Sequence, residues 1–546
     1  MKKDKVVLVN PGIHFQEPLY YGMYPNTAIM VLATILHNAG FRVKVIDGKY
    51  KKIDDAVKGI LGEIDESLIF IGFSVMTVQL PWAYYVSKAV KSKNPDTKIV
   101  WGGVHPTLFP EQTARDKAVD IVVVNDAART VASLAAALAA EGDISSIPGL
   151  FYKEGSGITS AHGDRVMDDF NCVPMIDFSL IDHNRYSRNN NIAIEEFYAG
   201  KYEDCRVYPV ITGLGCAYKC TFCINVILNR KYHFRDAAEI VDRIKLLRRD
   251  YGADFIQPMD ENFFINRKRT FEFLDLLEKE NLRIKWRPQT RADYFNDNYL
   301  NLEVARRLDR CGMVVAAMGV ESASQRILDK LNKQLRVEQI IKAAEILSKT
   351  NIVPKMNFMT GLPGETEDDI KKTYRLAVRL RKMIGKSCVT ISPFRPYPGS
   401  PLYDQIVREY GYSPPSTLED WARLSQSEFA EGVGYESFER YKWIKNPGKL
   451  KAMQCVYGEI AWYRPQRDDK LHGKIRSFIA FMRFKFDFFL FVFLEKRFFD
   501  DLSRLKSFIK RLKNGVNPVR DSHRLKSAVI SNGVKEKKDT KIYAED

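Results

Sequence analysis

Residues 6 to 124 alternate short apolar runs with longer segments in which apolar residues recur every three or four positions. The short runs predict buried strands, and the longer segments predict amphipathic helices. The predicted strands are 6–9, 42–46, 68–73 and 98–101, and the predicted helices are 27–39, 53–64 and 81–93. Strands that alternate with helices are typical of βαβ units, so we expect a doubly wound, Rossmann-like parallel sheet.

Polar or glycine-containing turns follow each of these predicted strands. In open parallel sheets, ligands bind beyond the carboxyl ends of the strands, so this edge is a candidate binding site. A dinucleotide is not expected there, because no G-x-G-x-x-G follows the first strand. The turn residues that could contact another ligand are Asn10, Asp47, Ser74, Gly102, Gly103 and His105.

A second series of strands and helices begins at residue 208. Its six βα units predict a partial (β/α)6 barrel of the TIM type over 208–403, with its chemistry at the carboxyl ends of the strands. A glycine- and proline-containing linker at 137–207 would separate this barrel from an N-terminal domain at 1–136. The predicted strands are 208–212, 254–259, 284–289, 313–318, 353–359 and 388–393, and the predicted helices are 236–250, 267–280, 300–311, 337–350 and 365–383.

The pattern changes after residue 403 to helices that are rich in aromatic residues, which predicts a helical C-terminal domain at 404–514. Within 471–513, aromatic residues recur at helical spacing between lysines and arginines. Such a basic amphipathic helix either packs on the barrel or contacts an anionic membrane surface. Residues 515–546 are polar and charged, so we expect a disordered basic tail.

Composition adds a basic surface to this picture. The 546 residues include 84 Lys and Arg against 68 Asp and Glu, a formal net charge of +16, and much of the excess lies late in the chain. Nucleic acid and anionic lipid would both be attracted to it. No run of about 18 apolar residues predicts a transmembrane helix. Sparse cysteines and no secretory signal predict a cytoplasmic protein, with a peripheral position at the inner membrane face if 471–513 binds lipid.

Three of the eight cysteines form a C-x3-C-x2-C array: Cys216, Cys220 and Cys223. Three thiolates so close together can hold three irons of a [4Fe-4S] cluster, and the missing fourth ligand leaves one iron open. The alternative is a structural zinc site that includes His233, because C-x2-C is also zinc spacing. It is disfavoured, since a closed zinc site needs four ligands and the chain has no second C-x2-C or H-x3-H pair.

The cysteine spacing resembles the signature of the radical S-adenosylmethionine (SAM) superfamily. The resemblance implies that SAM chelates the open iron through its amino and carboxylate groups, and that an electron from the cluster cleaves SAM to a 5'-deoxyadenosyl radical. Polar segments at successive barrel strand ends match the family's segments in order. The SAM contacts implied in this way are Asp260, Glu261, Asn262, Gln289, Arg291, Gly319, Glu321 and Ser322.

The order of strands and turns from 6 to 124 resembles the cobalamin-binding domains that are fused to many radical SAM proteins. This implies cobalamin as a further cofactor at the turns named above. The D-x-H-x-x-G motif that supplies a histidine to cobalt in methionine synthase is absent, and His14 lies in the corresponding loop at a different spacing. We therefore expect no protein histidine on cobalt. The segment from Asn125 to Thr130, N-D-A-A-R-T, replaces the family's G-E-G-E-x-T.

These resemblances imply a cobalamin-dependent radical SAM enzyme, similar to the group that contains radical methyltransferases and the anaerobic magnesium-protoporphyrin monomethyl ester cyclase. It would start radical C–H chemistry, methyl transfer or cyclisation, on a small and hydrophobic substrate, with an electron donor such as flavodoxin or ferredoxin and no nucleic acid. The competing interpretation is a non-catalytic iron-sulfur redox sensor that binds nucleic acid through its basic tail. That interpretation does not explain Glu261, Arg291 and Glu321 at the strand ends.

Overall fold

The computed structural model describes residues 3–13, 15, 25–125, 127–155, 157–160, 170–187, 205–228, 231–385, 388–429, 441–462, 478–480 and 482–483. It divides into two compact units, Met1–Pro447 and Gly448–Asp546, which are described separately.

The N-terminal sheet of the first unit has the strand order β2-β1-β3-β4-β5-β6-β7. Strands β1 to β5 pair in parallel, and β6 and β7 add an antiparallel edge. The order reverses at β1, which lies between β2 and β3, and ligands bind at such switch points in open α/β sheets. The bounds are β1 (Lys5–Asn10), β2 (Arg42–Asp47), β3 (Leu68–Ser74), β4 (Ile99–Gly102), β5 (Ile121–Val123), β6 (Leu150–Glu154) and β7 (Gly157–Ser160).

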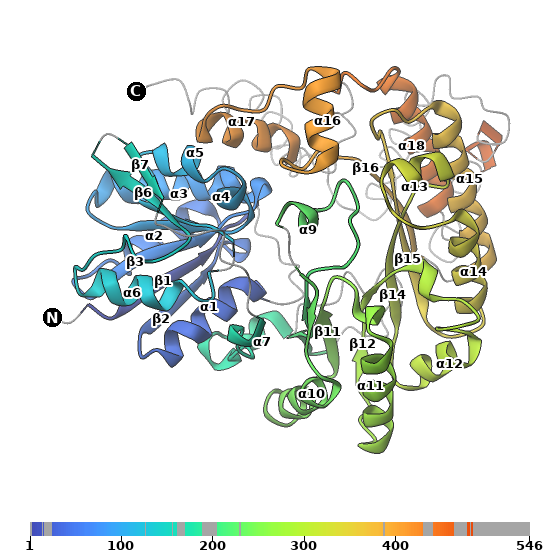
Figure 1. Ribbon diagram of the computed structural model, residues 1–546, viewed down its shortest axis with the longest axis horizontal. Helices are drawn as coiled ribbons and strands as arrows, with labels where there is room; N and C mark the ends of the chain where they lie inside the picture. Colours follow the sequence, from blue (N-terminus) through green and yellow to red (C-terminus); the bar gives the residue numbers. More distant parts are fainter. Residues whose placement is uncertain are drawn as a thin grey trace, which may run out of the picture. The chain divides into compact units, whose positions relative to one another are not determined.

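Helices cover both faces of this sheet, as the sequence pattern predicts (Figure 1). On one face, α1 (Thr27–Asn38) and α6 (Val131–Ala139) pack their apolar side chains against inward residues of β1, β3, β4 and β5. On the other face lie α2 (Ile53–Leu61) and α3 (Leu80–Lys93). A helix from far along the chain, α17 (Leu418–Phe429), joins this second face through Leu418, Trp421 and Ala422.

The barrel strands follow the predicted order but divide into two sheets, β12-β11-β8 and β13-β14-β15-β16. All of their pairings are parallel. The predicted third strand, 284–289, is two short strands, because Pro288 has no N–H to continue the ladder. The bounds are β8 (Val207–Ile211), β11 (Phe255–Met259), β12 (Lys285–Trp286), β13 (Gln289–Thr290), β14 (Val315–Glu321), β15 (Val353–Thr360) and β16 (Cys388–Pro393).

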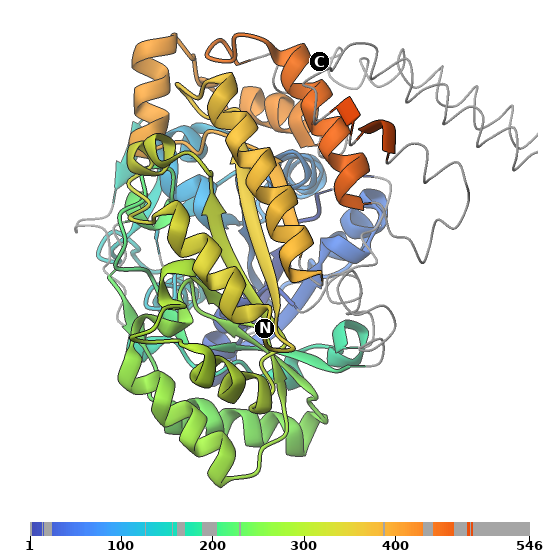
Figure 2. The ribbon, with the colours of Figure 1, turned by 90° about the vertical axis from the view of Figure 1, so that its right-hand side faces the viewer.

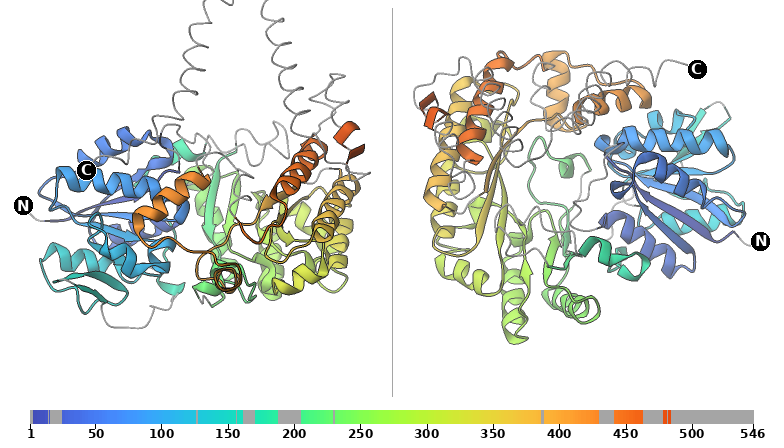
Figure 3. Two further views of the ribbon diagram at one scale, coloured as in Figure 1. Left: turned by 90° about the horizontal axis from the view of Figure 1, so that it is seen from above. Right: turned by 180° about the vertical axis from the view of Figure 1, so that it is seen from behind.

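The barrel helices lie along the outer side of these strands (Figures 2 and 3). Each buries an apolar stripe, such as Ile340, Ala344 and Leu347 of α14. A partial TIM-type barrel of six βα units is therefore confirmed as the fold of this region. The bounds are α10 (Ala237–Tyr251), α11 (Arg267–Lys279), α12 (Leu302–Arg310), α13 (Gln325–Lys330), α14 (Val337–Leu347), α15 (Glu367–Ile384) and α16 (Pro401–Tyr410).

Short elements complete the first unit. They are α4 (Val104–Leu108), α5 (Pro110–Arg115), α7 (His183–Ser187), α9 (Ile224–Ile227), β9 (Gly213–Leu214), β10 (His233–Phe234) and the 3-10 turns η1 (Gly48–Tyr50), η2 (Thr77–Gln79), η3 (Phe170–Cys172), η4 (Phe178–Leu180), η5 (Phe263–Ile265) and η6 (Ala292–Tyr294).

The second unit is described mainly through α18 (Pro447–Trp462), which begins at the boundary. Ala452 and Val456 of this helix pack against Ala480. Most of 471–513 and all of the predicted tail at 515–546 lie outside the described residues. Among the helices that the structure describes, none is long and apolar enough to span a bilayer.

Candidate functional site

The cysteine loop begins and ends beside the carboxyl end of β8, at a small two-stranded ladder. Strand β9 pairs antiparallel with β10, so the loop between them leaves and returns at the same point. The thiols of Cys216, Cys220 and Cys223 form no disulfide. The Cys223 N–H donates to the carbonyl of Cys220 at 3.1 Å, which tightens the turn that carries the last two cysteines.

The surroundings of these thiols fit thiolate ligands. Burial raises the pKa of Cys220, and the cations of Lys333 and Arg291 oppose that rise. Burial also raises the pKa of Cys223, which is close enough to Cys216 for the two sulfurs to interact electrostatically. Among the described residues, no three His, Cys, Asp or Glu side chains converge on a single ion. In a [4Fe-4S] cluster each thiolate binds a different iron, so its cysteine ligands do not have to converge on one ion as they would around a single metal.

Arg291 packs against the cysteine loop. Its guanidinium lies 3.6 Å from the centre of the Tyr218 ring, in the middle of the C-x3-C segment. The same group donates to the carbonyls of Lys333 and Gln334 at 2.8 and 2.9 Å, and to Asp293 at 2.9 Å. The N–H donors of Arg291 named here are therefore bonded to protein groups. Its guanidinium face contacts the Tyr218 ring of the cysteine loop.

Of the three polar residues after β11, Glu261 is the most exposed. Asp260 is buried and pairs with Arg269 at 3.0 Å. Asn262 is buried as well and donates from Nδ2 to the Tyr294 hydroxyl at 2.8 Å. Glu261 is therefore the carboxylate of this segment that is best placed to meet a ligand.

The segment at the end of β14 holds a buried ion pair. Glu321 accepts from Lys333 Nζ at 2.9 Å, and its backbone has φ of 60°, a strained value for glutamate. Gly319 leaves room for this pair, because a Cβ there would meet the Glu321 carboxylate and force it to move. Burial alone would lower the pKa of Lys333, but Glu321 and Cys220 outweigh it and raise the pKa. Ser322 lies deeper and contacts the Thr373 hydroxyl at 3.2 Å.

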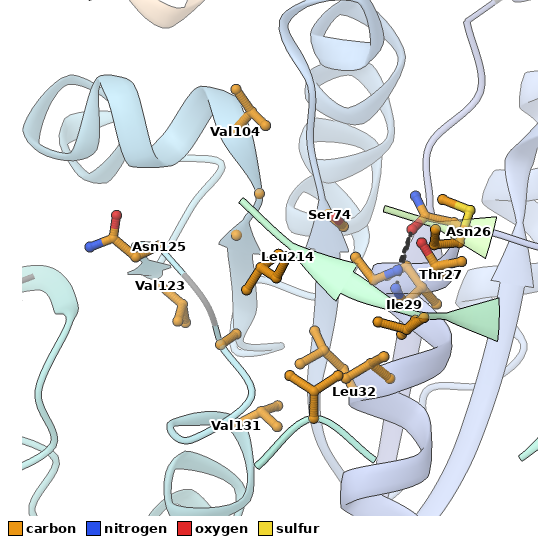
Figure 4. Close-up of a pocket in the computed structure, with 18 of the residues that line it drawn as sticks. Asn26, Thr27, Ile29, Leu32, Ser74, Val104, Val123, Asn125, Val131 and Leu214 are labelled. Atoms are coloured by element: carbon orange, nitrogen blue, oxygen red, sulfur yellow. Dashed lines mark hydrogen bonds between the residues drawn. The ribbon is translucent and has the colours of Figure 1, made fainter. Parts of the chain in front are cut away.

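A cavity of about 530 Å³ lies at the carboxyl edge of the N-terminal sheet and is lined by barrel residues as well. Figure 4 shows Leu214, which is on β9 beside the cysteine loop, among side chains of α1 and of the sheet edge. The polar and glycine residues of the wall are Asn26, Thr27, Gly72, Ser74, Gly102, Gly103, Thr107 and Asn125 from the N-terminal side, and Gly213, Gln257, Asp260, Glu261 and Gln289 from the barrel side.

The N-terminal wall is mainly apolar and carries a few polar groups that could meet the amide and phosphate oxygens of a bound corrinoid. Leu8, Val100 and Leu134, which belong to the core between the sheet and helices α1 and α6, line part of the cavity. Gly103 has φ of 97°, and a Cβ there would lie 2.7 Å from the Val75 nitrogen. Only glycine lets the turn after β4 pass this close to the backbone at the end of β3, so Gly103 fixes the shape of the cavity rim.

Asn10 and Asp47 do not line the cavity but are connected by hydrogen bonds to Asn26, which does. Asn10 donates to Asp47 Oδ1 at 2.8 Å, and Asn26 donates to Asn10 Oδ1 at 2.8 Å. Asn26 also caps α1 by accepting from Ala28 N–H. Asp47 accepts in addition from the Tyr186 hydroxyl at 3.0 Å. These hydrogen bonds fix Asn26, which lines the cavity.

His105 lies behind the cavity rim. It is fully buried, contacts the Thr77 hydroxyl through Nδ1 at 3.3 Å, and packs against Phe109 and Trp421. Burial lowers the pKa of His105 to about 3, so the ring is neutral. It is not among the residues that line the cavity, which leaves Ser74, Gly102 and Gly103 as the predicted N-terminal residues that are.

Sequence reasoning missed several residues of this site. Asn26 carries the signal of a helix N-cap, which indicates a helix start but no ligand. Leu214 and Gln257 belong to apolar strand segments and carry no signal. Lys333 follows α13 rather than a strand, so the strand-end rule could not select it.

Two family models match the chain: the radical SAM superfamily over residues 210–377 and the B12 binding domain over residues 20–135. An uncharacterized methyltransferase of Pyrococcus horikoshii is 26% identical over 74% of this chain and 84% of the relative. The anaerobic magnesium-protoporphyrin IX monomethyl ester cyclase of Rubrivivax gelatinosus is 24% identical over 74% of this chain and 70% of the relative.

Two solved structures share the fold. The radical SAM methyltransferase TsrM of Kitasatospora setae, with cobalamin and a [4Fe-4S] cluster bound, has a TM-score of 0.57 at 17% identity and covers 75% of each chain. The cobalamin-dependent SAM radical enzyme OxsB, with aqua-cobalamin and SAM bound, has a TM-score of 0.60 at 18% identity, covering 87% of this chain and 72% of that one. None of these matches supports the redox-sensor interpretation.

Proposed function

We propose a function from one premise: the chain belongs to the radical SAM superfamily and carries an N-terminal B12-binding domain. It is an enzyme whose cofactors are a [4Fe-4S] cluster, SAM and cobalamin. We infer that it acts on a small molecule with an apolar carbon framework, by methyl transfer or by a cyclisation that starts from the same hydrogen abstraction.

The observation that carries this proposal is the shared cavity. Ser74 and Gly102, at the carboxyl edge of the N-terminal sheet, and Leu214, beside the cysteine loop, line the same space. When bound, SAM on the cluster supplies the power to abstract hydrogen, and cobalamin supplies a methyl group or electrons. A substrate between the two would be within reach of both.

Different residues of this chain would hold the cluster and SAM. Cys216, Cys220 and Cys223 would hold the cluster. Glu261 and Gln289, which are exposed at the barrel rim of the cavity, would orient SAM through its ammonium and hydroxyl groups. Two relatives are bacteriochlorophyllide methyltransferases of Chlorobaculum tepidum, and an apolar framework like that of a bacteriochlorophyllide suits walls such as Leu32, Val104 and Val131.

The test uses the full chain, reconstituted without oxygen and supplied with cobalamin, SAM and dithionite. We expect 5'-deoxyadenosine to form. Its absence from protein with an intact cluster would contradict the function. SAM with a deuterated methyl group then separates the two outcomes, since only methyl transfer carries deuterium into the product.

A cavity-filling variant tests the shared site itself. Leu214→Trp should abolish turnover while the iron content stays that of the wild type, because the indole would fill the space between the two cofactors. Phe234→Trp is the matched control: Phe234 stands on the paired strand β10, is exposed, and does not line the cavity. Wild-type turnover by Leu214→Trp would show that the chemistry takes place elsewhere.

Two partners follow from the sequence. We propose a small electron-transfer protein such as flavodoxin or ferredoxin as the reductant of the cluster. We also propose that 471–513, through its basic and aromatic residues, contacts an anionic membrane surface.

A further inference from the structure

Asn125 stands just after β5 in a backbone conformation that few residues adopt. Its φ is 61°, in the left-handed region that glycine enters freely and that asparagine tolerates best among residues with a side chain. The Asn125 N–H donates to the Thr107 hydroxyl at 2.8 Å, which holds the turn in place. An asparagine here therefore keeps the turn that a glycine would make and adds a side chain.

The added side chain carries a donor that no described residue satisfies. Asn125 is one of the residues that line the cavity (Figure 4). Its Nδ2 is buried without a hydrogen-bond partner in the described part of the chain. The nearby Thr107 hydroxyl already donates to the Gly103 carbonyl at 2.8 Å and accepts from Asn125 N–H. A buried amide donor left without an acceptor is costly, so this group is suited to a partner that arrives with a ligand.

We propose that Asn125 is a specificity-determining residue for the corrinoid, and that its Nδ2 donates a hydrogen bond to an acceptor oxygen of bound cobalamin. The inference rests on the proposed function, in that it places cobalamin in this cavity. Two sources of acceptor oxygen exist on cobalamin: the amide carbonyls around the corrin ring and the phosphate of the nucleotide loop. The N-D-A-A-R-T segment thus replaces a glycine with a residue that contributes its own contact.

Cobalamin binding to the full chain, measured by absorbance titration and equilibrium dialysis, provides the test. Asn125→Gly keeps the backbone turn and removes only the donor, so we expect the Kd to rise roughly three- to tenfold, the effect of losing one neutral hydrogen bond. Asn125→Asp keeps the size and the tolerance for positive φ but turns the donor into an acceptor. It should weaken binding more than Asn125→Gly does.

Asn281→Gly is the matched control. Asn281 also has a positive φ, 46°, but it is exposed and lies between α11 and β12, outside the cavity lining. Its variant should leave the Kd unchanged. Thermal unfolding of each variant without cobalamin checks the fold, and Asn125→Asp serves as the second probe if Asn125→Gly proves unstable.

Cobinamide, which lacks the nucleotide loop, distinguishes the two sources of oxygen. An equal loss of affinity for cobinamide and cobalamin in Asn125→Gly assigns the bond to a corrin amide, and a loss for cobalamin alone assigns it to the phosphate. A wild-type Kd for cobalamin in folded Asn125→Gly would overturn the inference and leave the proposed function standing. Failure of the wild-type chain to bind cobalamin would instead overturn the cobalamin part of the proposed function.

Discussion

Cysteines of this chain differ in whether their surroundings favour the thiolate. Burial raises the pKa of both Cys220 and Cys311, but two cations oppose the rise at Cys220, whereas Glu278 adds to it at Cys311 and the pKa there reaches about 12. We expect the triple variant Cys216→Ala, Cys220→Ala, Cys223→Ala to lose its brown absorbance and its iron. Cys311→Ala should keep both. If the triple variant, reconstituted without oxygen, still holds about four irons per chain, the cluster is not at these cysteines.

Burial of His105 makes stability depend on pH. The unfolded chain protonates this imidazole below about pH 6.5, but the folded chain does so only near pH 3. The unfolded state therefore binds more protons in that window, and stability is lost as pH falls through it. Between pH 6.5 and 5, the loss from His105 should be about 2 kcal/mol.

His105→Phe keeps an aromatic ring against Phe109 and Trp421 and removes the titration. Urea unfolding at pH 7 and at pH 5 should show a smaller pH dependence for this variant than for the wild type. Equal pH dependence in both proteins would mean that the folded state accommodates the charged imidazole.

At the scale of elements, α17 follows the barrel in the chain and packs against the N-terminal sheet. Trp421 is 3% exposed and its ring centre lies 5.0 Å from that of Phe109. Trp421→Ala should lower the free energy of unfolding by roughly 3 kcal/mol, because it leaves a cavity in the core. Arg423→Ala, on the same helix but exposed, should cost less than about 0.5 kcal/mol. Denaturant curves give both values, and a cost for Trp421→Ala as small as that of the control would mean that α17 docks without stabilising the sheet.

Elements whose apolar pattern was strong could be predicted within a few residues. The predicted helix 337–350 is Val337–Leu347, and the predicted strand 68–73 is Leu68–Ser74. The third barrel strand was predicted as continuous and is interrupted, because its pattern is apolar while the break depends on the missing N–H of Pro288. The docking of α17 on the N-terminal sheet was not predictable, since periodicity shows that a face is apolar but not which distant surface covers it.

The same limit applies to the candidate site. The strand-end rule selected Glu261, Gln289 and Ser74, which line the cavity, because parallel strands bring their carboxyl ends to one edge. It also selected Asp260 and Arg291, whose charges are engaged by Arg269 and Asp293, although Asp260 lines the cavity as well. Arg269 comes from α11 and Asp293 from the turn that follows Arg291, and a sequence pattern cannot show which polar groups will pair with one another.

At the scale of the whole molecule, the two cofactor domains contribute to one cavity within the first unit. The barrel contributes Gly213 and Leu214 of β9, next to the cysteine loop, and the N-terminal sheet contributes its switch-point edge. Each domain alone would leave its ligand edge open to water. A cavity lined from both sides excludes more water than either edge alone, and reactive species are protected from side reactions where water is excluded.

The chain has a formal net charge of +16, and residues 471–513 contain lysines and arginines that could bind an anionic membrane. Aromatic residues at helical spacing supply apolar area there, and each basic residue near an anionic surface adds on the order of 1 kcal/mol. The longest apolar run, residues 488–494, is too short to cross a bilayer. We expect the full chain to sediment with anionic vesicles at low salt and to be released as salt rises, because exposed charges are screened beyond about 8 Å at physiological ionic strength. A chain that ends before Leu471 should stay in the supernatant. Equal sedimentation of both chains, or of neither, would show that 471–513 does not hold the protein to the membrane.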